Sequence, residues 1–155
     1  MEFEIRKAQF SDAVLLAPRL RESDVNEIRA ASGMDPLAAL VESVKVSDED
    51  MCWCATLEGR PEVLFGASPF AEDIGGIWLL GSARIYDAPF SFLRHCRDYL
   101  KVMHERYLYL TNFVDIRHNA ANKWIAKLGF KPAVCIPDFG FERRPFTQYL
   151  SKRSS

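Results

Sequence analysis

The stretch Asn119-Ala-Ala-Asn-Lys-Trp-Ile-Ala-Lys-Leu-Gly-Phe130 decides the fold of this chain. It has the pattern of a short amphipathic helix, and Gly129 is the kind of residue that commonly ends one. Just before it, residues 109–115 (YLTNFVD) have the composition of a buried strand, and a further strand is expected near 131–136. The sequence therefore predicts a strand–helix–strand unit at this end of the chain.

The same reasoning, applied outward from this unit, predicts alternating elements along the whole chain. Strands are expected at 3–7, 51–57, 63–67, 77–81 and 139–150. Helices are expected after Ser11, after Ser23, after Asp35-Pro36, and over 91–107. Antiparallel strands followed by strand–helix–strand units indicate an α/β (α+β) fold, with a mixed, mostly antiparallel central sheet and helices on both faces.

Length and charge narrow the possible classes of protein. The chain has 155 residues, of which 48% are hydrophobic and 26% charged, so we expect one domain over 1–150 and a frayed tail at 151–155. A net charge of −1 gives no basic surplus for nucleic acid. No apolar run reaches the length of a membrane span, and the charged N-terminus lacks a signal peptide, so we expect synthesis in a cytoplasm.

The cysteines and histidines do not predict a metal site. Cys52 and Cys54 are one residue apart, which is not the spacing of paired zinc ligands, and the three histidines are far from them in sequence. We interpret these two thiols, with Cys96 and Cys135, as reduced and mostly buried in the core.

The order of elements, with residues 128–130 (LGF) closing the last helix, resembles the GNAT (GCN5-related N-acetyltransferase) superfamily over nearly the whole chain. Within it, residues 76–81 (GIWLLG), 97–107 (RDYLKVMHERY) and 110–115 (LTNFVD) resemble the small internal virion proteins of T7-like podophages, which often carry the label of acetyltransferase. This narrower resemblance implies a structural or internal virion or tail component. It also implies a virion location after synthesis in a host cytoplasm, and other phage virion proteins as partners.

The broader resemblance implies an acyl-CoA site between two parallel strands, with the diphosphate on a glycine-rich loop at a helix N-terminus. Here the matching loop, 82–91 (SARIYDAPFS), contains no glycine, Asp87 adds negative charge, and Pro89 removes an N–H donor. We therefore expect weak or absent binding of acetyl-CoA. The candidate cofactor-binding residues are Leu80, Gly81, Arg84, Ser91 and Asn119.

Catalysis would also need an acid and a base. The resemblance implies a tyrosine as general acid four residues before Gly129, but Ile125 occupies that position. Glu27 is a candidate base, because a partly buried carboxylate has a raised pKa. The alternative for Glu27 is a capping box with Asp24 at a helix start. His118 is the other candidate base, with a structural hydrogen-bonding role as its alternative. Asn119 is alternatively a helix N-cap.

Three functions stay open at this point. The first is a non-catalytic virion component with a degenerate acyl-CoA site. The second is an active acetyl-CoA-dependent N-acetyltransferase acting on a protein or a small-molecule amine. The third is an inhibitor or modifier of a host protein.

Overall fold

A computed structural model describes residues 2–154 of the chain. Its strands are β1 (Glu4–Lys7), β2 (Cys52–Leu57), β3 (Arg60–Ala71), β4 (Ile74–Gly81), β5 (Tyr109–Asp115), β6 (Lys131–Phe139) and β7 (Arg144–Lys152). Its α-helices are α1 (Phe10–Leu16), α2 (Glu22–Ser32), α3 (Pro36–Val46), α4 (Pro89–Arg106) and α5 (Asn119–Lys127). Two short 3-10 helices are η1 (Ala17–Arg19) and η2 (Ala83–Asp87).

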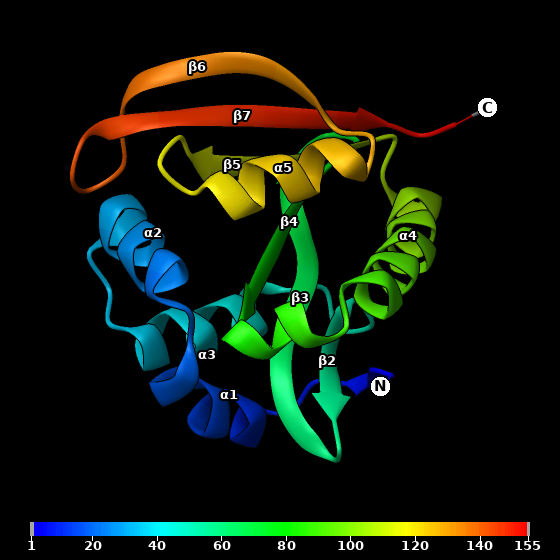
Figure 1. The fold of residues 1–155 in the computed structure, drawn as a ribbon. Coiled ribbons are helices and arrows are strands. Elements are labelled where there is room, and N and C mark those ends of the chain that lie inside the picture. Colours follow the sequence, from blue (N-terminus) through cyan, green and yellow to red (C-terminus); the bar gives the residue numbers. More distant parts are fainter. Residues whose placement is uncertain (1, 155) are drawn as a thin grey trace.

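The strands form one mixed sheet in the order β1-β2-β3-β4-β5-β7-β6. Neighbouring strands are antiparallel throughout the described chain, except β4 and β5, which are parallel. These two strands pair only over Ile74–Gly76 and Tyr109–Thr111, and beyond this point they diverge (Figure 1). The predicted fold class is therefore confirmed, and the divergence opens a gap in the middle of the sheet.

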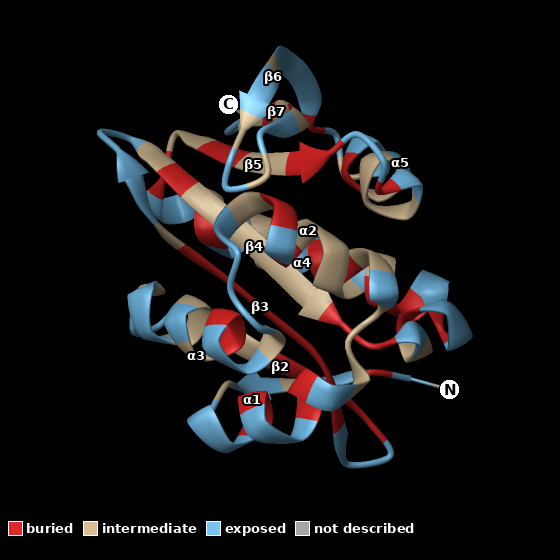
Figure 2. Ribbon diagram, turned by 90° about the vertical axis from the view of Figure 1, so that its left-hand side faces the viewer, coloured by how far each residue is buried: buried red, intermediate tan, exposed pale blue. Residues whose placement is uncertain are grey.

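Helices cover both faces of the sheet, as the sequence predicts. The larger apolar core lies under α4 and α5 and includes Phe92, Val114 and Ile125. The smaller core lies under α1 and α3 and includes Leu16 and Leu40. In Figure 2, β3 is buried along most of its length, whereas β6 is an exposed strand at the sheet edge. The helix α2 lies across the place where β4 and β5 part.

The stretch that decides the fold has the predicted structure. The helix α5 ends at Lys127, two residues before Gly129, whose φ of 93° suits glycine, and the buried Phe130 leads into β6. A second glycine ends α2: Gly33 has a φ of 73°, and a Cβ there would lie 3.0 Å from the ring of Phe141. Both helix ends therefore depend on the absence of a side chain.

Some boundaries differ from the sequence-based prediction. The helix after β1 begins at Phe10, one residue before the Ser11 that was expected to cap it, and it is short, ending at Leu16 before Pro18 in η1. The loop after β4 contains η2, which the pattern did not indicate. The predicted tail at 151–155 begins too early, since Ser151 and Lys152 pair with β5, and Ser155 is outside the described residues.

Two absences hold for the part of the chain that the structure describes. No helix within residues 2–154 combines the length and the apolar character that a membrane crossing requires. Nor does that range gather three or more His, Cys, Asp or Glu side chains where they could hold a metal ion.

Candidate acyl-transfer site

The gap between β4 and β5 presents main-chain groups of β4 that β3 does not use. Gly81 faces away from β3, because its N–H donates to Asp24 (3.0 Å) and its C=O accepts from the Arg21 N–H (3.0 Å). In an antiparallel pair the direction of these groups alternates, so Leu79 also turns its N–H and C=O into the gap. A ligand carrying amides can therefore extend the sheet at this position.

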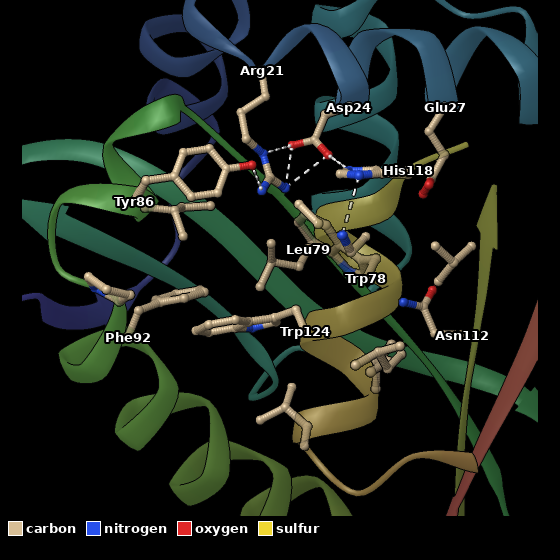
Figure 3. A pocket seen from close by; sticks show the side chains of 18 residues that line it. Arg21, Asp24, Glu27, Trp78, Leu79, Tyr86, Phe92, Asn112, His118 and Trp124 are labelled. Atoms are coloured by element: carbon tan, nitrogen blue, oxygen red, sulfur yellow. Dashed lines mark hydrogen bonds and ion pairs between the residues drawn. The ribbon is translucent and has the colours of Figure 1, made fainter. Parts of the chain in front are cut away.

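A mainly apolar cavity of about 120 Å³ occupies the gap and is drawn in Figure 3. Its apolar walls come from β4, β5, α4 and α5, and they include Ile77, Leu79, Phe92, Val114, Trp124, Ile125 and Leu128. Its polar lining lies on the α2 side and comprises Arg21, Asp24, Glu27, Asn112 and His118. The volume suits the narrow end of a ligand and is below the range of about 300–1,000 Å³ that is usual for a whole drug-sized molecule.

A buried carboxylate, Asp24, joins three elements at the edge of this cavity. It accepts two hydrogen bonds from the Arg21 guanidinium, both 3.0 Å, as well as the Gly81 N–H. The His118 ring is its third partner, with 3.0 Å between Nε2 and Oδ1. Arg21 also donates to the Tyr86 hydroxyl at 3.3 Å, so the network extends to η2. The Asp24 carboxylate thus already occupies the main-chain N–H of Gly81, the Arg21 guanidinium and the His118 imidazole at this edge of the cavity.

His118 is held on both ring nitrogens and is not placed to act as a base. The Ala121 N–H points at Nδ1 (3.3 Å), so Nδ1 accepts and the proton lies on Nε2, which donates to Asp24. Both ring nitrogens of His118 are hydrogen-bonded within the protein, which fits the structural role given above as the alternative to a base. His118 is also the N-cap of α5, and the predicted capping role of Asn119 is wrong.

Glu27 is the other candidate base, and its surroundings differ from those of Asp24. Its carboxyl is partly buried, and burial raises its pKa to about 7, although the Asp115 N–H, 3.2 Å from Oε2, favours the charged form. Figure 3 shows it apart from the Asp24 network, on the next turn of α2. It does not form a capping box, because α2 begins at Glu22 with Arg21 as N-cap, so that alternative is wrong for Glu27 and Asp24.

A second hollow, of about 390 Å³, lies on the other side of Glu27. We call it the aromatic groove. It is bounded by α2, α3, β4, β5 and the facing ends of β6 and β7, and its aromatic lining residues are Trp78, Phe113, Phe139 and Phe146. Glu27, Trp78, Leu79 and Asn112 line both the cavity and the groove. Glu27 therefore lies where a ligand bound in the cavity would meet a second ligand bound in the aromatic groove.

The candidate cofactor-binding residues are not brought together. Gly81 is at the edge of the gap with its amide held by Asp24, and Leu80 lines the aromatic groove. Ser91 is buried against the N-terminal strand, accepting from the Phe3 N–H at 3.1 Å and donating to Glu2 at 2.9 Å. Asn119 is exposed and does not line the cavity.

Arg84, the fifth of these candidates, faces carboxylates. Its guanidinium lies 3.1 Å from Asp87, 3.7 Å from the fully buried Glu62 and 3.9 Å from Glu58. Ion pairs with three carboxylates disfavour its turning towards a phosphate.

The loop between β4 and α4 does not form an open cradle for a diphosphate. The N–H groups of Arg84 and Ile85 bond to Ser82, through its hydroxyl (3.2 Å) and its C=O (3.3 Å). Pro89 occupies the first turn of α4 and supplies no N–H there. Phe92 and Trp124 stack at 5.6 Å across the space between α4 and α5. Two main-chain N–H groups of this loop, those of Arg84 and Ile85, are therefore used within the loop itself.

Some residues that line the site were missed by sequence reasoning. Leu79 contributes main-chain atoms, which no side-chain pattern reveals. Asn112 is in the predicted strand 109–115, yet its position at the point of divergence depends on how far β4 and β5 pair. Glu42 was inside a predicted helix, and only the packing of α3 beside the groove gives it a place there.

Comparison with known proteins identifies the class of fold to which this structure is similar. No family model and no curated protein matches the sequence. Solved structures do match: a GNAT-family acetyltransferase from Bacillus anthracis has a TM-score of 0.72 at 11% identity, over 98% of this chain and 95% of that one. An N-acetyltransferase from Staphylococcus aureus has a TM-score of 0.69 at 13% identity, over 98% and 99%.

A third solved structure is an aminoglycoside acetyltransferase in complex with coenzyme A, with a TM-score of 0.70 at 15% identity, over 98% of this chain and 95% of that one. The chain therefore has the fold of the GNAT acetyltransferases, as the sequence resemblance implied. These structures do not link it to phage virion proteins, so that narrower resemblance stays a prediction.

Proposed function

We propose that this chain is an N-acyltransferase that moves an acetyl group from acetyl-CoA to an amine, with Glu27 as the general base. The observation that carries the proposal is the position of Glu27, whose carboxyl lines both the cavity in the β4–β5 gap and the aromatic groove. A carboxyl with a pKa near 7 is suited to accept a proton at neutral pH.

The residues divide the reaction as follows. Glu27 takes one proton from the bound ammonium ion and leaves a neutral amine. The amine nitrogen forms a bond to the thioester carbon while the Leu79 N–H, which faces the gap, can donate to the carbonyl oxygen. The C–S bond then breaks, and the second proton of the nitrogen leaves with the sulfur as the thiol. Ile125 stands where the resemblance implies a tyrosine, and a thiol of pKa about 8.5 is a good leaving group without that acid.

Release of free CoA thiol from acetyl-CoA, measured with a panel of primary amines, tests the proposal. We expect Glu27→Gln to lower kcat by about 100-fold or more, because amide nitrogen and oxygen cannot accept the proton. Glu22→Gln is the matched control, since Glu22 is an exposed carboxylate on the same helix and lines neither hollow. Unchanged turnover in Glu27→Gln, or no thiol release with any amine, would refute the proposal.

A second candidate is a non-catalytic component of a phage particle, with other virion proteins as partners. The loop between β4 and α4 favours it, since the N–H groups of Arg84 and Ile85 bond within the loop and the Arg84 guanidinium pairs with Asp87. Mass spectrometry of purified particles of a phage that encodes this chain tests this candidate directly. Absence of the protein from such particles would refute it.

A further inference from the structure

The aromatic groove has an uneven charge distribution. Its described lining contains two carboxylates, Glu27 at the inner end and Glu42 on α3, and no Lys, Arg or His. Glu42 is exposed, and in the described chain it has neither a hydrogen bond nor an ion pair. A groove lined by carboxylates without matching cations attracts a positively charged ligand.

Apart from these two carboxylates the groove lining is mainly apolar, with Ser32, Ser43 and Asn112 as its other polar members. The rings of Phe113 and Phe139 stack with their centroids 5.0 Å apart and an interplanar angle of 13°. The ring centroids of Phe139 and Phe146 are 4.5 Å apart. Aromatic faces of this kind bind methylene chains by burial and cations through the ring quadrupole. The groove lining thus combines two carboxylates with an aromatic surface.

The wall that carries Phe139 is fixed in place. The turn after β6 donates two main-chain hydrogen bonds to the end of α2, from Phe141 N–H to Ala31 C=O (3.1 Å) and from Glu142 N–H to Ala30 C=O (3.0 Å). Gly140 allows this approach, because a Cβ there would lie 2.7 Å from that main chain. The groove is therefore preformed, and a ligand need not order it first.

We infer that the acceptor is an alkyl diamine or polyamine, an amine that carries a second cationic centre beyond an apolar spacer. The inner ammonium lies at Glu27, the methylene chain packs on the phenyl rings, and the outer ammonium pairs with Glu42. Only the identity of the inner nitrogen as the acetylated one rests on the proposed function. The volume of about 390 Å³ accommodates such a molecule.

Binding without any acyl donor tests this inference separately from catalysis. Diaminopentane and pentylamine are titrated into the purified protein at low salt and followed by calorimetry. We expect the diamine to bind about 5-fold or more tightly than the monoamine, and Glu42→Gln to remove most of that difference, as for an ion pair near the surface. Glu105→Gln, an exposed carboxylate on α4 outside the groove, should leave both affinities unchanged.

Equal affinity for the two amines, no binding of either amine, or a diamine preference that survives Glu42→Gln would each overturn the inference. Because no thioester is present, these outcomes do not depend on acetyl transfer. Conversely, diamine binding with no thiol release would leave the ligand assignment standing and refute the acyltransferase.

Discussion

Asp24 and Glu27 lie on neighbouring turns of α2, but their surroundings differ. The comparison shows how far the environment decides the chemistry of a carboxylate. Asp24 is surrounded by donors, whereas Glu27 accepts one main-chain N–H and its pKa is raised mainly by burial. Glu27 could be nominated from the sequence, because a family resemblance placed this helix beside the acceptor side. A raised pKa was expected if this carboxyl was partly buried, but the burial itself depends on strands that are distant in the sequence.

The raised pKa of Glu27 makes a prediction about stability. Between its ordinary value of 4.5 and its folded value of about 7, the folded state binds more protons than the unfolded state. The free energy of unfolding should therefore fall as pH rises through this window, by up to about 3 kcal/mol. The free energy of unfolding of Glu27→Gln should not show this fall of up to about 3 kcal/mol. At pH 8 the variant should therefore be more stable than the parent protein.

Urea unfolding of the parent and of Glu27→Gln at about pH 5 and pH 8 measures this difference. Glu42→Gln, which removes an exposed carboxylate from the same groove, should keep the pH dependence of the parent. If the free energy of unfolding of Glu27→Gln changes with pH as much as that of the parent protein, the raised pKa of Glu27 is refuted.

At the scale of elements, the Asp24 network determines how α2, β4 and α5 meet around the gap. Apart from the Arg21–Asp24 pair, which is three residues apart, the contacts of Asp24 are not indicated by local sequence: His118 is 94 residues from Asp24, and Gly81 is 57 residues away. The same limit explains Ser91, which the loop pattern assigned to a cofactor and which the fold buries against Phe3. The helix bounds, in contrast, follow local signals such as Gly33, Asp35-Pro36 and Gly129.

Replacing Asp24 tests the role of this network. Asp24→Asn leaves the buried Arg21 guanidinium without its counter-charge, so we expect a loss of about 3 kcal/mol in the free energy of unfolding. Asp50→Asn is the matched control, because Asp50 also pairs with an arginine, Arg106, but at the surface. There we expect little or no loss, because solvent screens an exposed ion pair. Equal losses in the two variants would contradict a joining role for Asp24.

At the scale of the whole molecule, the sequence was sufficient for the architecture. The LGF ending of α5 and the alternation of strands predicted the mixed sheet with helices on both faces, and the structure and its solved relatives confirm it. The sequence was less informative about the site, because that site is a gap. A gap is defined by where two strands stop pairing, here after Gly76 and Thr111, and by main-chain atoms that face it. The absence of glycine from the loop 82–91 was visible, and the internal bonds of that loop agree with it.

The central claim is that the β4–β5 gap is built for a thioester arm and that the loop beside it is not built for a diphosphate. Calorimetric titration with acetyl-CoA and with S-acetylpantetheine, which lacks the diphosphate, tests it most directly. We predict dissociation constants within about tenfold of each other, because Arg84 faces three carboxylates and the N–H groups of Arg84 and Ile85 bond within the loop. A built cradle with two or more charge-assisted hydrogen bonds would make acetyl-CoA bind more than about 100-fold more tightly, and that result would contradict the claim.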